Sequence, residues 1–470
     1  MPKSQDNIEN IIVLMLENRS FDHMFGYLTI DQPKVPGDKI DNLHGDESNL
    51  DSEGTAVPVS MDAKYSGDYR VDPGHHYPDV TEQLFEKDDV RSSAKPTMGG
   101  FVKNYGAQPG GSVAASHRIM KCFDPQKLPA LTTLAKEYAV CDRWFSSIPG
   151  PTLPNRAFVH ACTSLGHVDM NPVAYWSVKS LYEQLDAQRV TSRVYSHDGN
   201  TIAFTFRNLF KKGGKFLGSY NDFLDDLDGK KLPKYCFVEP RFNDWYDEAN
   251  HIYYISDDQH PDNNVVEGEL LIREVYEAIR DSRYWEKCLF VITYDEHGGF
   301  FDHVPPPKTV PSGQEGDKAT FDFKRLGVRV PAVLISPYIE RGTIVHTQLE
   351  HSSIAATVRE LLAPDMPPLT DREKNANTFE DVLTLTDPRD DLKTLDMKGL
   401  RRSDVDPNTH GSATLSDQQR NQVLAAYYMD LDRPAGKRVI GSNGITVLED
   451  INTEQKAAMY IKEVSESLGQ

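Results

Sequence analysis

Three long runs of apolar residues stand out along the chain and predict the buried strands of a sheet. They cover Asn10–Leu16, Cys288–Tyr294 and Val330–Ser336. Each run is almost continuous rather than alternating with polar residues, which is typical of strands covered on both faces in a parallel sheet. A shorter strand is expected over Ala139–Asp142.

Segments with helical spacing lie between and after these runs. Over residues 265–283 the apolar side chains recur on one side of a helix. Further helices are expected over residues 128–138, 154–162, 351–362, 416–429 and 453–468. Strands that alternate with helices predict an α/β fold, a three-layer α/β/α sandwich with a mostly parallel central sheet.

Polar segments between these elements give only an approximate indication of the domain boundaries. Residues 31–72 and 86–117 are rich in Asp, Gly, Pro and Ser and are expected to be long surface excursions, and residues 369–412 are polar and irregular. The length of 470 residues suits about three domains or one large α/β domain with insertions. We expect one catalytic domain over residues 1–395 and a small, partly helical C-terminal extension over 396–470.

Charge restricts the partners. The chain has 51 Lys and Arg against 71 Asp and Glu, a net charge of −20, and it has no long basic run. A general binder of duplex nucleic acid needs a basic face, so no nucleic-acid partner is expected. An anionic substrate would have to be attracted locally, by a metal ion or a helix N-terminus.

No stretch approaches the roughly 20 apolar residues of a membrane helix, and the N-terminus lacks the apolar region of a secretory signal. A cytoplasmic protein, or one secreted by a non-classical route, is therefore expected. Transient contact with a membrane surface is compatible with this composition, and the oligomeric state is left open. The five cysteines are widely spaced and are expected to be small buried hydrophobic residues.

Acidic residues follow two of the predicted strands. Glu17 and Asn18 come after the first, and Asp295 and Glu296 after the second. Ligands of open parallel sheets bind beyond the carboxyl ends of the strands, and three carboxylates there would repel one another unless a divalent cation were bound. An all-oxygen ligand set suits Ca, Mg, Mn or Zn. The alternative is that these residues merely cap neighbouring helices.

Thr152 lies in the turn Gly150–Arg156, just before an expected helix. Beside a metal ion its hydroxyl would be a nucleophile; otherwise it is an ordinary helix cap. Asn155 is either a turn residue or a contact for a phosphoryl oxygen.

Several histidines lie in loops beside Gly, Pro or Asp, where functional residues are common. Imidazoles act as general acids and as donors to phosphoryl groups, although each histidine could instead be structural. The candidates are His75, His197, His260, His303 and His351.

Several motifs point to one family. The segment Glu17–Gly26 resembles the opening motif of the bacterial phospholipase C and acid phosphatase phosphoesterase family, which includes the plant non-specific phospholipases C. The resemblance covers about residues 8–362. Six further motifs follow in the family's order, at Asp72–His75, Gly150–Arg156, Glu239–Arg241, His260–Pro261, Asp295–Pro307 and His351–Ser353.

The resemblance implies an alkaline-phosphatase-like fold and assigns roles to the candidate residues. The implied metal ligands are Glu17, Asn18, Thr152, Asp295 and Glu296, with Thr152 as the nucleophile. The implied phosphoryl pocket contains His75, His197 and His260, with Asn155, His303 and His351 as substrate contacts. A threonine nucleophile is more similar to the phospholipase C branch, since the acid phosphatase branch uses serine.

The expected activity is therefore that of a metal-dependent phosphoesterase with a phosphothreonine intermediate and His260 as proton donor. A phospholipase C that cleaves glycerophospholipids such as phosphatidylcholine is favoured over a broad acid phosphatase. Choline could be held by the aromatic residues Trp144, Phe145, Tyr220 and Trp245. From another class, Asp257, Asp258 and Asp262 could be ligands of a non-catalytic calcium-binding protein. A sulfatase is disfavoured because its modification motif is missing.

Overall fold

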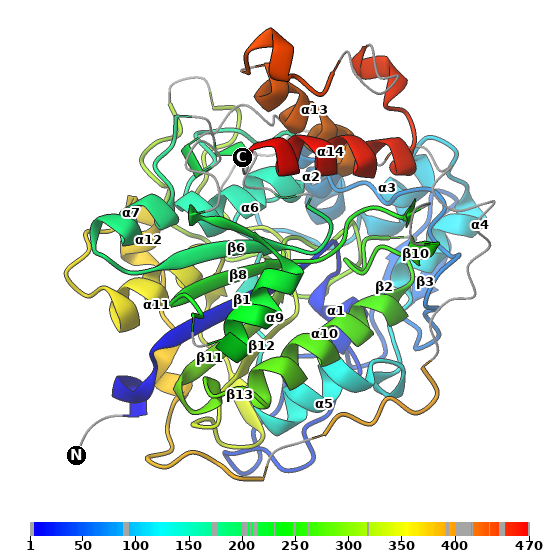
Figure 1. Cartoon of the computed structure of the whole chain (residues 1–470). Coiled ribbons are helices and arrows are strands. Elements are labelled where there is room, and N and C mark those ends of the chain that lie inside the picture. The colour runs from blue at the N-terminus through cyan, green and yellow to red at the C-terminus, as the bar shows by residue number, and fades with distance from the viewer. Residues whose placement is uncertain are drawn as a thin grey trace.

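An eight-stranded sheet forms the centre of the part of the chain that is described (Figure 1). Its strand order is β13-β4-β12-β11-β1-β8-β6-β7. β12 runs antiparallel to both neighbours, and the other adjacent pairs are parallel. The strands are β1 (Asn10–Leu16), β4 (Ala139–Cys141), β6 (Ser192–Ser196), β7 (Leu217–Ser219), β8 (Tyr235–Glu239), β11 (Cys288–Tyr294), β12 (Ala332–Ile335) and β13 (Thr343–Val345). The prediction of a mostly parallel sheet is confirmed.

The computed structural model describes most of the chain. The described ranges are 4–87, 94–170, 177–199, 215–229, 231–247, 251–261, 263–316, 319–391, 394–400, 417–431, 433–440 and 447–468, with residues 201, 205, 206, 208, 209 and 415.

The two longest strands, β1 and β11, are fully buried and lie side by side in parallel. Leu16, the last residue of β1, pairs with Tyr294, the last residue of β11. β8 lies on the other side of β1 and ends at Glu239. Because the carboxyl ends of parallel strands meet at one edge, the residues after β1 and β11 are brought together there.

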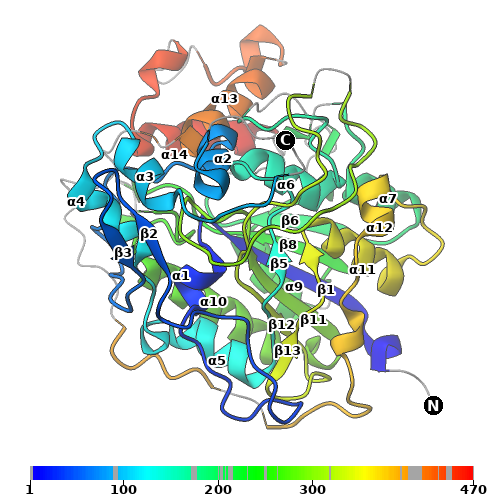
Figure 2. The same ribbon diagram turned by 180° about the vertical axis from the view of Figure 1, so that it is seen from behind.

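Helices cover both faces of the sheet, which completes the predicted three layers (Figures 1 and 2). On one face lie α5 (Pro129–Glu137), α9 (Tyr220–Gly229) and α10 (Val265–Arg280). On the other lie α6 (Thr152–Ala161), α7 (Leu181–Ala187) and α11 (Ser352–Leu362). The predicted helices are confirmed as α5, α6, α10 and α11, whereas α7 and α9 were not predicted. Shorter elements are α1 (Phe21–Phe25), α12 (Asp371–Asn375), β5 (Trp144–Phe145), β14 (Leu349–Glu350), and the 3₁₀ helices η1 (Ser4–Asn7), η3 (Pro125–Lys127), η6 (Trp285–Lys287) and η7 (Glu380–Val382).

The two expected surface excursions are more ordered than their composition suggests. The first contains the hairpin of β2 (Ser48–Leu50) and β3 (Ala56–Pro58). After α2 (Tyr77–Phe85), the second contains α3 (Phe101–Ala107), α4 (Val113–Ser116) and η2 (His117–Met120). Apolar residues from both segments, including Val57 from the first and Phe101 from the second, form a second hydrophobic cluster. These segments therefore form a side wall of the molecule.

The C-terminal extension contains two helices, α13 (Asp417–Leu431) and α14 (Glu454–Leu468), with η8 (Ala435–Lys437) and η9 (Leu448–Asp450) between them. The two predicted C-terminal helices are confirmed within a residue or two, although Ser416 lies outside the described residues. α13 and α14 pack on each other around a hydrophobic cluster of their own. α14 also contacts β9 (Trp245–Asp247), which pairs with β10 (Ile252–Tyr254). The domain boundary at residue 395 stays a prediction.

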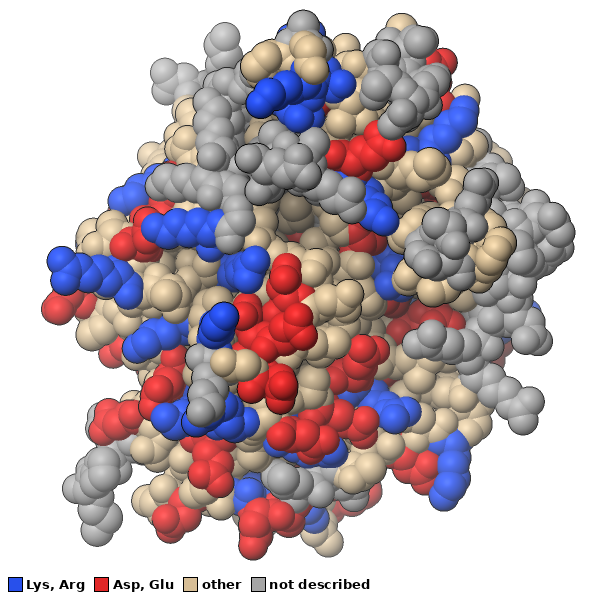
Figure 3. Space-filling view, in the orientation of Figure 1, with Lys and Arg blue, Asp and Glu red and all other residues tan. Residues whose placement is uncertain are grey.

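The surface agrees with the acidic composition. In Figure 3, acidic side chains gather over α9 and α10, and the face shown has no continuous basic surface. All five cysteines are buried and unpaired, as expected. Among the described residues, the helices are either too short or too polar to cross a bilayer.

Candidate active site

The carboxyl ends of β1 and β11 converge as the sequence predicts. Glu17 and Asn18 follow β1, Asp295 and Glu296 follow β11, and all four are buried. The backbone N–H of Asn18 donates to Asp295 Oδ1 at 3.0 Å. Asn18 has a φ of 55°, in the left-handed region, which turns the chain sharply at the end of the strand.

Thr152 approaches these four residues from α6, one of the helices that cover the sheet. It is the first residue of α6, follows the turn that ends at Pro151, and is 1% exposed. Its Oγ1 donates to Asn18 Oδ1 at 3.3 Å. Pro154 lies in the first helical turn, where it removes no helical hydrogen bond. A hydroxyl and acidic residues more than a hundred positions apart are thus neighbours.

Asn155 braces the turn before α6. Its Oδ1 accepts from the Ile148 N–H at 3.0 Å, and its Nδ2 donates to the Gly150 carbonyl at 2.7 Å. Both ends of the amide are therefore engaged with the backbone. The structure does not bring this side chain to the cavity described below, so the substrate contact stays a prediction that these bonds do not support.

Sequence reasoning missed the role of Arg156. Its Nε donates to Asp295 Oδ2 at 3.1 Å and its Nη2 to Glu17 Oε1 at 3.0 Å, all within the buried interior. Burial opposes the charge of the guanidinium, but Asp295 and Glu17 outweigh it and raise its pKa. The positive charge of Arg156 thus offsets part of the repulsion expected between the carboxylates of Glu17 and Asp295. The available signal was the spacing of four from Thr152, which places both residues on one side of a helix.

Glu296 supplies the strongest indication of a metal ligand. Its Oε2 accepts from the Gly298 N–H at 2.7 Å, but its buried Oε1 has no hydrogen-bond partner among the described residues. Burial raises the pKa of Glu296 to about 8, Asp295 acts in the same direction, and His75 opposes both. A buried carboxylate oxygen without a hydrogen-bond partner, at the edge of the sheet where the Thr152 hydroxyl meets the Asn18 amide oxygen, suits a hard divalent cation. The oxygen chemistry of these residues therefore fits the implied metal.

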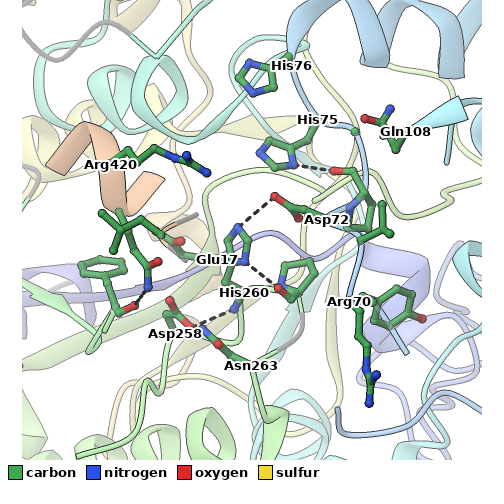
Figure 4. A pocket seen from close by; sticks show the side chains of 18 of the residues that line it. Glu17, Arg70, Asp72, His75, His76, Gln108, Asp258, His260, Asn263 and Arg420 are labelled. Atoms are coloured by element: carbon green, nitrogen blue, oxygen red, sulfur yellow. Dashed lines mark hydrogen bonds and ion pairs between the residues drawn. The ribbon is translucent and has the colours of Figure 1, made fainter. Parts of the chain in front are cut away.

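His75 and His260 face a cavity of about 700 Å³ next to Glu17 (Figure 4). Their ring centroids are 6.2 Å apart. Each Nδ1 lies within hydrogen-bond distance of a nearby carbonyl, 2.8 Å from Pro73 O for His75 and 2.9 Å from Pro261 O for His260. If each Nδ1 carries a proton, Nε2 is left for a ligand.

The electrostatic surroundings of the two rings differ. Burial lowers the pKa of His260. For His75 burial acts in the same direction, but Glu296 and Asp72 outweigh it and raise the pKa.

His197 and His351 are close to the site but do not line the cavity. His197 follows β6, and its Nδ1 is 2.8 Å from Asp257 Oδ2. His351 precedes α11, with Nε2 at 2.6 Å from the carbonyl of Asp295, and Trp144 Nε1 donates to its Nδ1 at 3.4 Å. His351 therefore positions the end of β11.

His303 belongs to a separate buried network around α1. Its Nδ1 is 2.7 Å from Asp22 Oδ2. Arg329 bridges Asp22 and Asp302, with distances of 3.0 and 2.9 Å. The carboxylates and His303 are close enough to hold a cation, but the buried guanidinium already supplies positive charge. The structure does not bring His303 to the cavity.

Comparison with known proteins decides the family. The model of the Phosphoesterase family matches residues 8–362. The chain belongs to the Phosphoesterase family. The predicted phosphoric ester hydrolase is thereby confirmed, and with the mostly parallel sheet so is the predicted fold class.

Similar proteins include plant and bacterial enzymes. Non-specific phospholipase C3 of Arabidopsis thaliana is 37% identical over 448 residues, covering 90% of this phosphoesterase and 82% of the relative. Non-specific phospholipase C1 of the same plant is 39% identical, with coverages of 83% and 73%. Phospholipase C B of Mycobacterium tuberculosis is 27% identical, with coverages of 78% and 76%. A solved protein of the alkaline phosphatase superfamily from Vibrio parahaemolyticus aligns with a TM-score of 0.34 and 13% identity, covering 54% of this chain and 65% of that one.

The aromatic residues considered for choline do not line the cavity of this phosphoesterase. Trp144 and Phe145 are fully buried in the hydrophobic core. Tyr220 packs on His197 with ring centroids 4.3 Å apart, and Trp245 stacks on Tyr254. Apart from the histidines, the aromatic side chains among the described residues that line the cavity are Tyr69 and Phe242.

The acidic loop considered for calcium binding is engaged within the chain. Asp257 lies beside His197 and Arg241. Asp258 Oδ1 accepts from Asn263 Nδ2 at 2.8 Å and from the His260 N–H at 3.0 Å. Asp262 lies outside the described residues. These bonds hold the loop that carries His260, which gives the carboxylates a structural role without a cation.

Proposed function

We propose that this phosphoesterase is a phospholipase C that hydrolyses the phosphodiester of glycerophospholipids such as phosphatidylcholine. One observation carries the proposal. The buried Thr152 hydroxyl lies at the acidic edge of the sheet, 3.3 Å from Asn18, and Glu17, the residue before Asn18, lines the same cavity as His75 and His260. The Arabidopsis relatives named non-specific phospholipase C support the choice of a lipid substrate.

A divalent cation is part of the proposal, with Ca, Mg, Mn and Zn as the candidates. Glu17, Asn18, Thr152, Asp295 and Glu296 would hold it. When bound, such an ion lowers the pKa of a neighbouring hydroxyl and stabilises charge on phosphoryl oxygens. Arg156 holds Glu17 and Asp295 in place and offsets their charge.

The residues of the chain then divide the chemistry between them. The Thr152 hydroxyl gives up its proton to solvent as Oγ1 attacks phosphorus, a phosphothreonine diester forms, and the bond from phosphorus to the glycerol oxygen breaks. His260 would have to be in its imidazolium form for this step, in which its Nε2 donates a proton to the departing alkoxide, which leaves as diacylglycerol. Water then attacks the phosphothreonine, the bond from phosphorus to Thr152 Oγ1 breaks, Oγ1 takes up a proton that the water loses, and the phosphorylated head group is released. His75, on the other side of the cavity, is the alternative proton donor, and His197 would act only through Asp257.

Variants at Thr152 test the covalent step. Thr152→Ala should lose at least about a thousandfold in kcat, because removal of a nucleophile leaves only the remaining site. Thr152→Ser should keep substantial activity, and acid quenching should trap a phosphorylated residue 152, detectable by mass spectrometry. Thr386→Ala, which changes an exposed threonine, is the matched control.

The substrates separate the alternatives. Phosphatidylcholine vesicles report phospholipase C activity through release of phosphocholine, and p-nitrophenyl phosphate reports phosphomonoesterase activity. Turnover of p-nitrophenyl phosphate alone would replace the proposal by an acid phosphatase. Calcium binding without turnover of either substrate would indicate a binding protein. Near-normal activity of Thr152→Ala would refute the covalent step.

A further inference from the structure

The C-terminal extension forms one wall of the cavity beside His75 and His260. Leu415, Gln419, Arg420 and Glu454 all line it, together with Glu17 from the other end of the chain. The helices α13 and α14, which carry most of these residues, lie over that part of the molecule in Figures 1 and 2. The extension is therefore in a position to touch whatever the cavity binds.

Specific hydrogen bonds fix this wall. Gln419, which is 5% exposed, donates from Nε2 to the carbonyl of Phe242 and to Glu454 Oε1, each at 2.9 Å. The Phe242 ring in turn packs under the guanidinium of Arg156, with 5.4 Å between the guanidinium carbon and the ring centroid. The residue next to Arg420 is thus tied to the loop that packs on the buried arginine of the site.

A second clamp holds α14. The side chain of Gln455 accepts from the Tyr246 N–H at 2.7 Å and donates to the Tyr246 carbonyl at 3.0 Å. This pair of bonds joins α14 to β9, whose first residue is only three positions after Phe242. The extension is therefore attached to the segment from Phe242 to Tyr246 at two places, through Gln419 of α13 and through Gln455 of α14.

The charge of the cavity makes a cation on this wall significant. Carboxylates dominate the lining, at Glu17, Asp72, Asp79, Asp244, Asp258 and Glu454. Among the described lining residues, guanidinium groups come from Arg70 and Arg420. Figure 4 shows the Arg420 side chain extending from α13 toward His75, whereas Arg70 points away from the histidines. An anionic phosphate ester that enters would be repelled by the carboxylates and attracted by Arg420.

We propose that Arg420 binds a non-bridging oxygen of the substrate's phosphoryl group, so that the C-terminal extension forms part of the substrate site. This inference rests on the proposed hydrolysis of a phosphate ester. The planar guanidinium matches phosphate oxygens with two parallel hydrogen bonds, which an ammonium group cannot reproduce. Arg420 acts in binding and orientation, since the nucleophile and the proton donors come from elsewhere.

Inorganic phosphate is the direct probe. Its dissociation constant, from calorimetry on the full chain, should rise about tenfold or more in Arg420→Gln, the loss expected for one charge-assisted interaction. The dissociation constant of Arg420→Lys for phosphate should lie between those of the parent and of Arg420→Gln. For p-nitrophenyl phosphate and a short-chain phosphatidylcholine, KM should rise by a similar factor while kcat changes less than about threefold, because ground and transition states lose the same contact.

Lys456→Gln is the matched control, since it removes one positive charge from an exposed position of the same extension. It should leave phosphate binding and KM unchanged. An Arg420→Gln variant that melts like the parent and binds phosphate within twofold of the parent would overturn the inference, as would an equal loss in Lys456→Gln.

The two proposals fail in different ways. If the parent binds phosphate through Arg420 but hydrolyses neither substrate, the proposed function falls and the binding role stands. If the parent hydrolyses the esters and Arg420→Gln does so with an unchanged KM, only the role of Arg420 falls.

Discussion

Replacement of Arg156 by methionine tests whether the buried guanidinium holds the acidic edge together. The change removes the positive partner of Glu17 and Asp295 but keeps much of the side-chain volume. Both ion pairs are 3.0–3.1 Å long, and no partner is more than 1% exposed. Removing one member of a buried pair costs about 3–5 kcal/mol, because the remaining charge stays desolvated. We therefore expect the free energy of unfolding of Arg156→Met to fall by about that amount.

Urea unfolding followed by tryptophan fluorescence, with a chelator present, measures this loss. The matched control is Arg273→Met, which breaks the Arg273–Glu277 pair of α10 where Arg273 is 43% exposed. An exposed pair of this kind contributes about 0.3–0.5 kcal/mol.

A saturating divalent cation adds a second arm to the experiment. It should restore part of the stability of Arg156→Met, because it replaces the missing positive charge, and it should not narrow the deficit of Arg273→Met relative to the parent. A loss for Arg156→Met no larger than that of the control would show that the carboxylates do not need the guanidinium, and the electrostatic reasoning would be wrong.

Three further outcomes are expected. Burial raises the pKa of Glu269 from 4.5 to about 8, although the N–H groups of Ala130 and Leu131 act in the opposite direction. The folded chain therefore holds this proton more tightly than the unfolded chain. The free energy of unfolding should accordingly fall as the pH rises between those two values. In urea titrations across that pH range, the free energy of unfolding should fall less steeply for Glu269→Gln than for the parent. For Glu286→Gln, at an exposed position, the pH dependence should match that of the parent. Gly298→Ala should lower both the melting temperature and the activity, because Gly298 has a φ of 62° and a Cβ there would lie 2.1 Å from the Asn18 carbonyl oxygen. The control Gly37→Ala, at a φ of 85° with open space around it, should lower only the melting temperature. His351→Phe should lower kcat more than it raises KM in steady-state assays, because it removes the contact with the Asp295 carbonyl and leaves the cavity lining unchanged.

The parts of the fold that the sequence predicts best are those with the strongest local pattern. β1 and β11 are seven-residue, fully buried strands, and their continuous apolar runs mark them almost to the residue. β7 and β13 have only three residues each, too few for any periodicity to be recognised. The order of the strands and the reversed direction of β12 depend on packing between distant segments, which no local pattern contains.

The candidate site shows the same division. Glu17 and Asp295 could be proposed because they directly follow recognisable strands, and Thr152 because it begins a helix after a turn. The function of Arg156 depends on which way α6 faces, and that of Arg420 on a contact across most of the chain. Asn155 and His303 are polar residues in motifs of the family, but neither reaches the cavity. Asn155 forms its hydrogen bonds with the backbone of the turn before α6, and His303 forms its hydrogen bond with Asp22 in a separate ion-pair network.

The cavity is lined by residues as far apart as Glu17 and Glu454. During synthesis, the nucleophile and the acidic edge can assemble well before the last helices have left the ribosome, but the pocket gains its final wall only when nearly the whole polypeptide is available. A chain that lacked α13 and α14 would therefore keep the residues of its reactive centre but would lose this wall of the cavity and Arg420 with it.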